Sequence, residues 1–110
     1  MMHAFEVLAD PVRRRIVELL VTQPQASGAI VTAIQRDFTV TQSAVSQHLR
    51  VLRDHGFATV QAEGARRVYA LNPRPLQDID QWLNGFRRFW EPKLDALATE
   101  IIRRKAPDAV

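Results

Sequence analysis

The hydrophobic pattern of the chain changes its period after Gly56, and this change constrains the fold more than any other feature of the sequence. Before that glycine, apolar residues recur every three or four positions, as they do in helices packed on a core. Residues 57–72 instead carry β-branched and aromatic side chains on both sides of Glu63-Gly64, which is typical of a β-hairpin. The helical period returns at residue 75. We therefore expect a mainly helical chain with one hairpin between its helices.

Four helices are predicted before the hairpin. Aspartate is a good N-cap and proline is favoured at the first helical position, so Asp10-Pro11 should separate a first helix, about residues 3–9, from a second that begins at Pro11. The sequence "PQASG" predicts a turn, followed by a third helix from Gly28 or Ala29 to residue 37.

The fourth helix is expected over residues 42–54. Thr41 is a suitable N-cap for it, and the glycine beyond its end can adopt the left-handed conformation that closes a helix. Three apolar residues would anchor it to the core, namely Val45, Leu49 and Leu52.

A last helix is expected over residues 75–105, with an apolar stripe spaced by threes and fours along one side. Pro92 interrupts this pattern, because a proline ring inside a helix clashes with the carbonyl group four residues earlier, here that of Arg88. We expect a kink or a break near residues 88–92.

Two helices joined by a short turn and followed by a two-stranded ribbon describe a winged helix-turn-helix. The expected fold class is thus mainly α with a small β-hairpin, in the order α-α-α-α-β-β-α. At 110 residues the chain should form one domain, residues 1–110. No apolar run predicts a transmembrane span or a signal peptide, and the absence of cysteine fits a cytoplasmic protein.

The exposed side of the predicted helix 42–54 carries hydroxyl, amide and guanidinium groups, with one acid, Asp54, at its far end. The major groove of B-DNA admits one α-helix and presents donors and acceptors that such groups can bind. An ordinary polar surface helix is the alternative. The residues expected to contact double-stranded DNA from this helix are Gln42, Ser43, Ser46, Gln47, His48, Arg50 and Arg53.

The positive charge of the chain is concentrated in its middle. Residues 36–74 hold six arginines and three acidic residues, whereas acids and bases balance on either side. An unneutralised basic patch is suited to a polyanion. At the hairpin tip, Arg66 and Arg67 could reach phosphates or the minor groove, although a charged tip is often merely solvated.

Three stretches resemble the ArsR-type (arsenical-repressor-like) winged-helix transcriptional regulators: "VLADPVRRRIVELL", "TQSAVSQHLRVLRDHGF" and "GARRVYALNP". The resemblance implies a homodimeric DNA-binding regulator of an inverted-repeat operator, usually a repressor and often of its own operon. It implies a DNA-binding core at about residues 11–73 and dimerisation through helices at about 3–9 and 75–105. The expected interface residues are Phe5, Leu8, Ile79, Trp82, Leu83, Phe86, Phe89, Trp90, Leu94, Leu97 and Ile101.

The chain departs from the metal-sensing branch of that family. It has no cysteine, and Trp82 stands where an Asp-x-His motif starting at Asp80 would place its histidine. The three histidines, His3, His48 and His55, have no metal-ligand spacing. We therefore expect no metal site and no cofactor. Whether the aromatic residues of the last helix hold a small-molecule effector, rather than only a dimer core, stays open.

Three other functions fit the sequence less well than DNA binding. An enzyme is not expected, because the sequence has no cysteine nucleophile, no glycine-rich phosphate loop and no suitably spaced acid pair. A protein-docking module would not require the central arginine excess. An RNA-binding module is harder to exclude, although the deep major groove of A-form RNA does not admit a helix.

Overall fold

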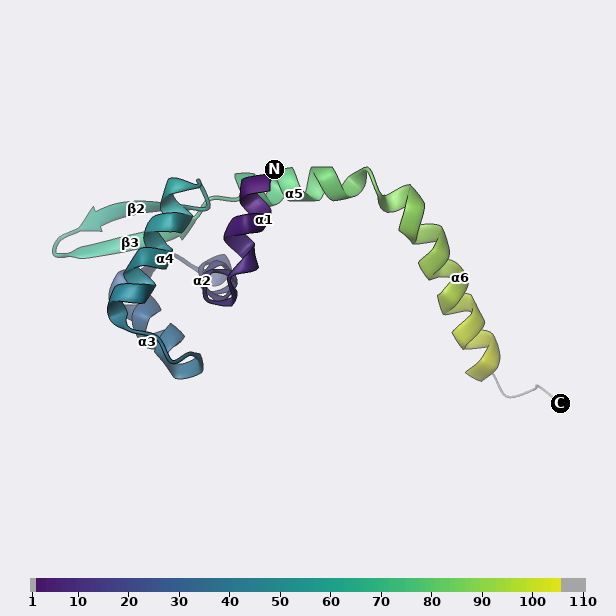
Figure 1. Cartoon of the computed structure of the whole chain (residues 1–110), viewed down its shortest axis with the longest axis horizontal. Coiled ribbons are helices and arrows are strands. Elements are labelled where there is room, and N and C mark those ends of the chain that lie inside the picture. Colours follow the sequence, from purple (N-terminus) through teal and green to yellow (C-terminus); the bar gives the residue numbers. More distant parts are fainter. Residues whose placement is uncertain (1, 106–110) are drawn as a thin grey trace. The chain divides into compact units, whose positions relative to one another are not determined.

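The computed structural model describes residues 2–105, which form helices and one small sheet (Figure 1). The chain divides into two compact units between Ile79 and Asp80. The first contains the sheet and the helices that pack against it, and the second, which begins at Asp80, contains the last helix. None of the described helices combines the length and the apolar character needed to cross a membrane.

The first two helices, α1 (Met2–Ala9) and α2 (Pro11–Thr22), separate where the sequence predicts. Asp10 is the N-cap of α2, and its Oδ1 accepts hydrogen bonds from the backbone N–H groups of Val12 (2.8 Å) and Arg13 (3.1 Å). Pro11 occupies the start of the helix, where its missing N–H costs nothing.

Helices α3 (Ser27–Asp37) and α4 (Gln42–Asp54) form the helix-turn-helix pair. The side chain of Thr41 caps α4 by accepting from the N–H of Ala44 at 3.0 Å, as predicted. Gly56 has a φ of 76°, which is the left-handed conformation expected after the helix. Helix α3 begins slightly earlier than expected, at Ser27.

The hairpin consists of β2 (Ala58–Glu63) and β3 (Arg66–Leu71), which pair antiparallel around a turn where Gly64 has a φ of 62°. The prediction of only a turn at "PQASG" was wrong, because β1 (Gln25–Ala26) adds a third strand in the order β1-β3-β2. A strand of two residues is too short to show a periodicity, and backbone pairing with Tyr69 and Val68 creates it.

One hydrophobic core joins these elements. Phe57, at the junction between α4 and the hairpin, is one of its largest fully buried side chains. The buried residues come from α1 to α4 and from both hairpin strands: Val7, Val12, Ile16, Val17, Leu20, Ile30, Ile34, Val45, Leu49, Leu52, Phe57, Ala58 and Tyr69. This core fixes how the helix-turn-helix sits on the sheet.

The last helical segment is two helices, α5 (Arg74–Asn84) and α6 (Arg87–Lys105), so the predicted break at residues 88–92 was misplaced. The helix is interrupted at Gly85, whose N–H donates to the carbonyl of Trp82 at 3.2 Å in a tight final turn. Glycine is costly inside a helix because it loses most backbone entropy there. Pro92 lies within α6, where it removes one hydrogen bond near the start of the helix.

Candidate nucleic-acid interface

The exposed side of α4 carries the polar residues that the sequence singles out for base contact. Opposite them, Val45, Leu49 and Leu52 are at most 2% exposed and hold the helix on the core. Since side chains on the two sides of one helix point apart, burial of this apolar side orients the other side toward solvent. The exposed predicted residues are Gln42, Ser43, Ser46, Gln47, Arg50 and Arg53.

The connection between α3 and α4 is held by short hydrogen bonds. The N–H of Phe38 donates to the carbonyl of Ile34 at 2.9 Å, which closes α3. The side-chain amide of Gln35 donates to the carbonyl of Val40 at 3.2 Å, just before α4 begins. These contacts set the angle at which α4 leaves α3, and therefore where its polar side points.

The charge on this side of α4 is positive. Arg53 lies 3.5 Å from Asp54, measured from Nε to Oδ1, so one arginine is partly neutralised. Arg50, by contrast, takes part in none of the ion pairs found among the described residues. An exposed arginine with no carboxylate beside it can donate its full fork of N–H groups to a phosphate or a guanine edge.

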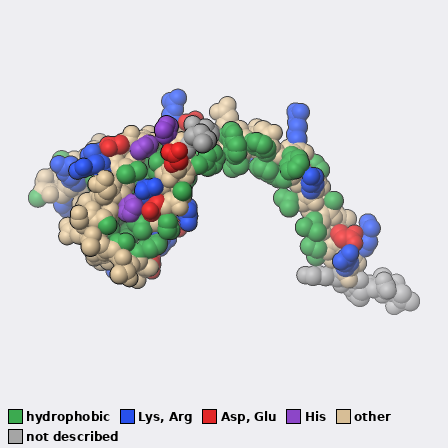
Figure 2. All heavy atoms as spheres, in the orientation of Figure 1, with side chains coloured by type: hydrophobic (Ala, Val, Ile, Leu, Met, Phe, Trp, Pro, Cys, Tyr) green, Lys and Arg blue, Asp and Glu red, His purple; other side chains and the backbone are tan. Residues whose placement is uncertain are grey.

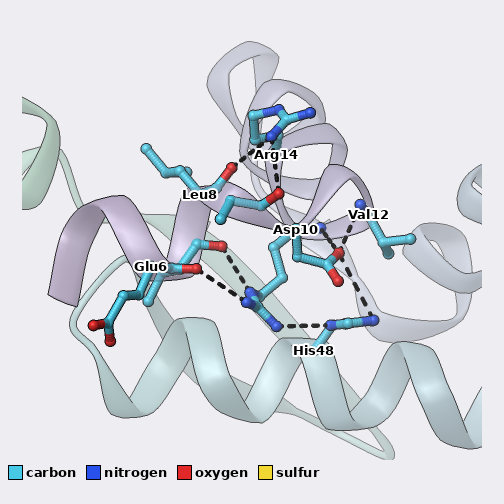
Figure 3. A network of polar contacts seen from close by, with 9 residues as sticks. Glu6, Leu8, Asp10, Val12, Arg14 and His48 are labelled. Carbon is cyan, nitrogen blue, oxygen red and sulfur yellow. Dashed lines mark hydrogen bonds and ion pairs between the residues drawn. The ribbon is translucent and has the colours of Figure 1, made fainter.

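His48 lies apart from the other predicted contact residues. Figure 3 shows its ring directed at the α1–α2 junction, with Nε2 3.9 Å from Asp10 Oδ1 and Nδ1 3.3 Å from Arg13 Nη1. Its side chain is only 19% exposed. The contact of Arg13 with His48 was not predicted, because nothing in the local sequence pattern links Arg13 to a residue on α4.

The two arginines of the wing lie on opposite faces of the ribbon. Arg66 pairs across the ribbon with Glu63, whose carboxylate is 3.4 Å from the guanidinium. Arg67 is the next residue along, and neighbouring residues of a strand point to opposite faces, so it shares a face with the buried Tyr69. In Figure 1 the tip of the ribbon extends beyond α4, which leaves both arginines exposed.

The residues predicted to form a dimer interface are mostly exposed in this single chain. Trp82 and Phe86 stack with their ring centroids 4.7 Å apart, yet each side chain is more than two-fifths exposed. Figure 2 shows hydrophobic side chains along α5 and α6. The exposed members of the predicted set are Phe5, Trp82, Phe86, Phe89, Leu94, Leu97 and Ile101, and the half-buried members are Leu8, Ile79, Leu83 and Trp90.

Ile102 is a large exposed residue that the prediction omitted, at 69% exposure. It stands beside the apolar stripe rather than in it, so its spacing provided no signal. Within residues 2–105, no three His, Cys, Asp or Glu side chains lie close enough together to hold a metal ion.

Comparison with protein families matches residues 8–61 to a family described as a helix-turn-helix domain. The helix-turn-helix-type transcriptional regulator Rv2034 of Mycobacterium tuberculosis is 40% identical over 98 residues, which cover 89% of this chain and 85% of that protein. The transcriptional repressor SdpR of Bacillus subtilis is 29% identical over 78% of this chain and 91% of its own length.

Solved structures share the fold. A possible transcriptional regulator for arsenical resistance superposes with a TM-score of 0.67 at 34% identity, over 91% of this chain and 97% of that one. An ArsR family transcriptional regulator superposes with a TM-score of 0.70 at 25% identity, over 81% of this chain and 88% of that one. The α4 helix and the wing therefore occur here in a fold that known regulators use.

Proposed function

Because this chain belongs to the ArsR-type winged helix-turn-helix transcriptional regulators, we propose that it acts as a homodimeric repressor of an inverted-repeat operator. The observation that carries the proposal is the exposed side of α4, which offers hydroxyls, amides and guanidiniums to the major groove. The protein is a transcriptional regulator with a helix-turn-helix DNA-binding domain. The repressor role, the dimer and the operator symmetry are the proposal.

Within α4, Ser43 and Gln47 are proposed to contact base edges. Both are exposed and stand one helical turn apart, so they would lie over neighbouring base pairs. Glutamine is suited to adenine, and Arg50, one turn further along than Ser46, is suited to guanine or phosphate. Gln42, Ser46 and Arg53 flank this set and would bind the phosphate backbone.

The wing is proposed to contribute affinity rather than sequence selectivity. Arg66 and Arg67 lie at the tip of a narrow ribbon, where they can reach phosphates or a narrow minor groove but not the base edges under α4. Such contacts bind any DNA sequence similarly and weaken as salt is added.

Dimerisation is proposed to involve the last two helices, with α1 as a further contributor. In residues 80–105, the large apolar side chains Phe89, Leu94 and Leu97 are each more than half exposed. Monomeric proteins rarely leave so contiguous an apolar surface in water, whereas dimer seams are built from such residues. Two subunits would place two α4 helices in successive major grooves on one side of the duplex.

Repression is the outcome that one relative favours, since SdpR is named a transcriptional repressor. A bound dimer that covers a promoter blocks RNA polymerase without any further activity, so no cofactor is needed. We further propose that the protein is cytoplasmic and that metal ions do not regulate it. The described residues offer such ions no cluster of ligands.

The test is selection of DNA fragments from a random pool by the purified 110-residue protein. We expect enriched fragments with two-fold-symmetric half-sites centred about one helical turn, 34–36 Å, apart. Gln47→Ala should then cost about 1–3 kcal/mol on the selected operator and leave random DNA nearly unaffected. Enrichment of no sequence, or equal affinity for structured RNA, would contradict the proposal.

A further inference from the structure

The end of α1 and the start of α2 form a joint, in which two arginines donate hydrogen bonds to the carbonyl groups at the end of α1. The last four carbonyl groups of a helix have no partner within it. Arg13 donates from Nε to the carbonyl of Val7 at 2.7 Å and from Nη2 to that of Glu6 at 3.2 Å. Arg14 donates to the carbonyls of Leu8 and Ala9 at 2.8 and 3.2 Å.

Arg13 differs from Arg14 in one respect. Its remaining nitrogen, Nη1, lies 3.3 Å from Nδ1 of His48, which belongs to the recognition helix α4 (Figure 3). The described contacts of Arg14 do not include His48. A single guanidinium therefore connects the last turn of α1 with α4, across 35 positions of sequence.

The chemistry of the contact fixes the form of the imidazole. Arginine can only donate hydrogen bonds, so Nδ1 must accept, and the proton of the neutral ring is on Nε2. That N–H faces Asp10, whose Oδ1 is 3.9 Å away and also caps α2. The ring is thus held by Arg13 on one side, and on the other side it lies beside the Asp10 carboxylate without a hydrogen bond to it.

We propose that His48 is a positioning residue, which fixes the rotation of α4 about its own axis by linking it through Arg13 to the end of α1. Apolar contacts of Val45 and Leu49 hold α4 on the core, but they are not directional, whereas a hydrogen bond is. Gln47 adjoins His48 in sequence and lies about 100° around the helix. A change in helix rotation at His48 therefore misdirects the side chains proposed to contact bases.

This inference rests on the proposed function, because its readout is the preference for the operator over random DNA. His48→Ala removes both ring contacts, whereas His48→Asn places an amide oxygen where Nδ1 stands and keeps the acceptor for Arg13. Arg13→Gln breaks the link from the other side. Arg14→Gln is the matched control, since it removes contacts to α1 of the same kind without touching His48.

We expect His48→Ala to lower operator affinity about tenfold, the order of one misdirected base contact, and to change random-DNA affinity by less than about twofold. The salt dependence should stay unchanged, because no phosphate contact is lost. His48→Asn should restore most of the preference. Arg13→Gln should reduce the preference for the operator as much as His48→Ala does. The double variant should reduce it no further than either single variant, since the two residues act as one unit.

Three results would overturn the inference. If His48 binds a phosphate, His48→Ala would weaken operator and random DNA equally and flatten the salt dependence. If the joint matters only for folding, Arg14→Gln would lose operator preference as fully as Arg13→Gln. Failure of His48→Asn to exceed His48→Ala would exclude the link to Arg13. A wild-type protein with no sequence preference would instead contradict the proposed function, before any variant is compared.

Discussion

Asp10 stabilises the chain through its charge as well as its position. The carboxylate accepts two backbone N–H groups at the start of α2 and faces His48. Partial burial alone would raise the pKa of Asp10. The N–H of Arg13, electrostatic attraction to His48, the N–H of Val12 and the Arg13 guanidinium outweigh it and hold the pKa below its ordinary value of 3.8.

Loss of this cap should be measurable as loss of stability. Asp10→Ala should lower the free energy of unfolding by about 1 kcal/mol, the usual cost of removing an N-cap. Asp10→Asn keeps a side-chain oxygen that can accept from the same N–H groups, so it should fall between Asp10→Ala and the wild type at neutral pH. Urea unfolding of the three proteins checks the order.

The difference in the free energy of unfolding between wild type and Asp10→Asn should become smaller as the pH falls. A carboxyl group whose pKa is lowered by folding contributes stability that is present above its unfolded pKa, 3.8, and is lost as the pH falls through the lower folded value. The stability gap between wild type and Asp10→Asn should therefore narrow on going from about pH 6 to about pH 3. A gap of constant size would show that the charge contributes nothing.

At the scale of single residues, the sequence predicts what local spacing determines. The caps at Asp10 and Thr41 follow from short patterns that adjoin their helices, and both are confirmed. The contact of His48 with Arg13 joins residues 35 positions apart, so only packing of α2 against α4 brings it about. Proximity of that kind has no local signature, so the sequence could not predict that His48 faces Arg13.

Among the elements, the wing shows how strand geometry separates two neighbouring arginines. Glu63 lies directly opposite Arg66 on one face of the ribbon, 3.4 Å from its guanidinium. Arg67 is on the other face, and the ion pairs of the described residues do not include it. Exposed pairs contribute little stability, but Glu63 still reduces the positive potential around Arg66.

Arg67→Ala should consequently weaken DNA binding more than Arg66→Ala does. Both variants should affect operator and random DNA alike, and Arg67→Ala should flatten the salt dependence by about two units of slope if each subunit loses one phosphate contact. Glu63→Gln is the matched control, which should raise affinity for both DNAs at low salt. Titrations over a range of salt concentrations measure all three, and a loss confined to the operator would show that the wing contacts bases.

The elements were predictable where a periodic pattern extends over several turns or residues. Helices α2 and α4 and strands β2 and β3 meet that condition. Strand β1 does not, because it has two residues and depends on β3 for its existence. The sequence predicts a break near Pro92 because a proline ring clashes with the preceding turn, whereas α5 ends just before Gly85, which is unfavourable inside a helix.

For the whole molecule, the proposed dimer depends on the apolar side chains of the last helices. Leu94 is 57% exposed, so Leu94→Asp should not disturb the core of the first unit, yet it would place a charge in the proposed seam. We expect this variant to shift sedimentation at micromolar concentration from dimer to monomer and to lower operator affinity with it. Leu94→Met is the control and should behave as wild type. A monomeric wild type would contradict the dimer.

Metal ions should not change the affinity of the protein for its operator. Zinc, cadmium and arsenite bind thiolates or clusters of imidazoles and carboxylates. The sequence has no cysteine, and residues 2–105 bring no such cluster together. Operator affinity should be the same with and without micromolar metal, as measured by fluorescence anisotropy. A shift above about tenfold would mean that a site forms in the dimer.

Strand β1 affects how the length of the wing can vary among proteins with this fold. It pairs with Val68 and Tyr69 and leads directly into α3, so the root of the hairpin is attached to the first helix of the helix-turn-helix pair. Between Val68 and the tip of the hairpin, β3 pairs with β2 and not with β1. Adding or removing one residue on each strand at the tip would thus change the length of the wing without altering the angle between the hairpin and α3. The wing can therefore vary in length while the orientation of the helix-turn-helix pair stays the same.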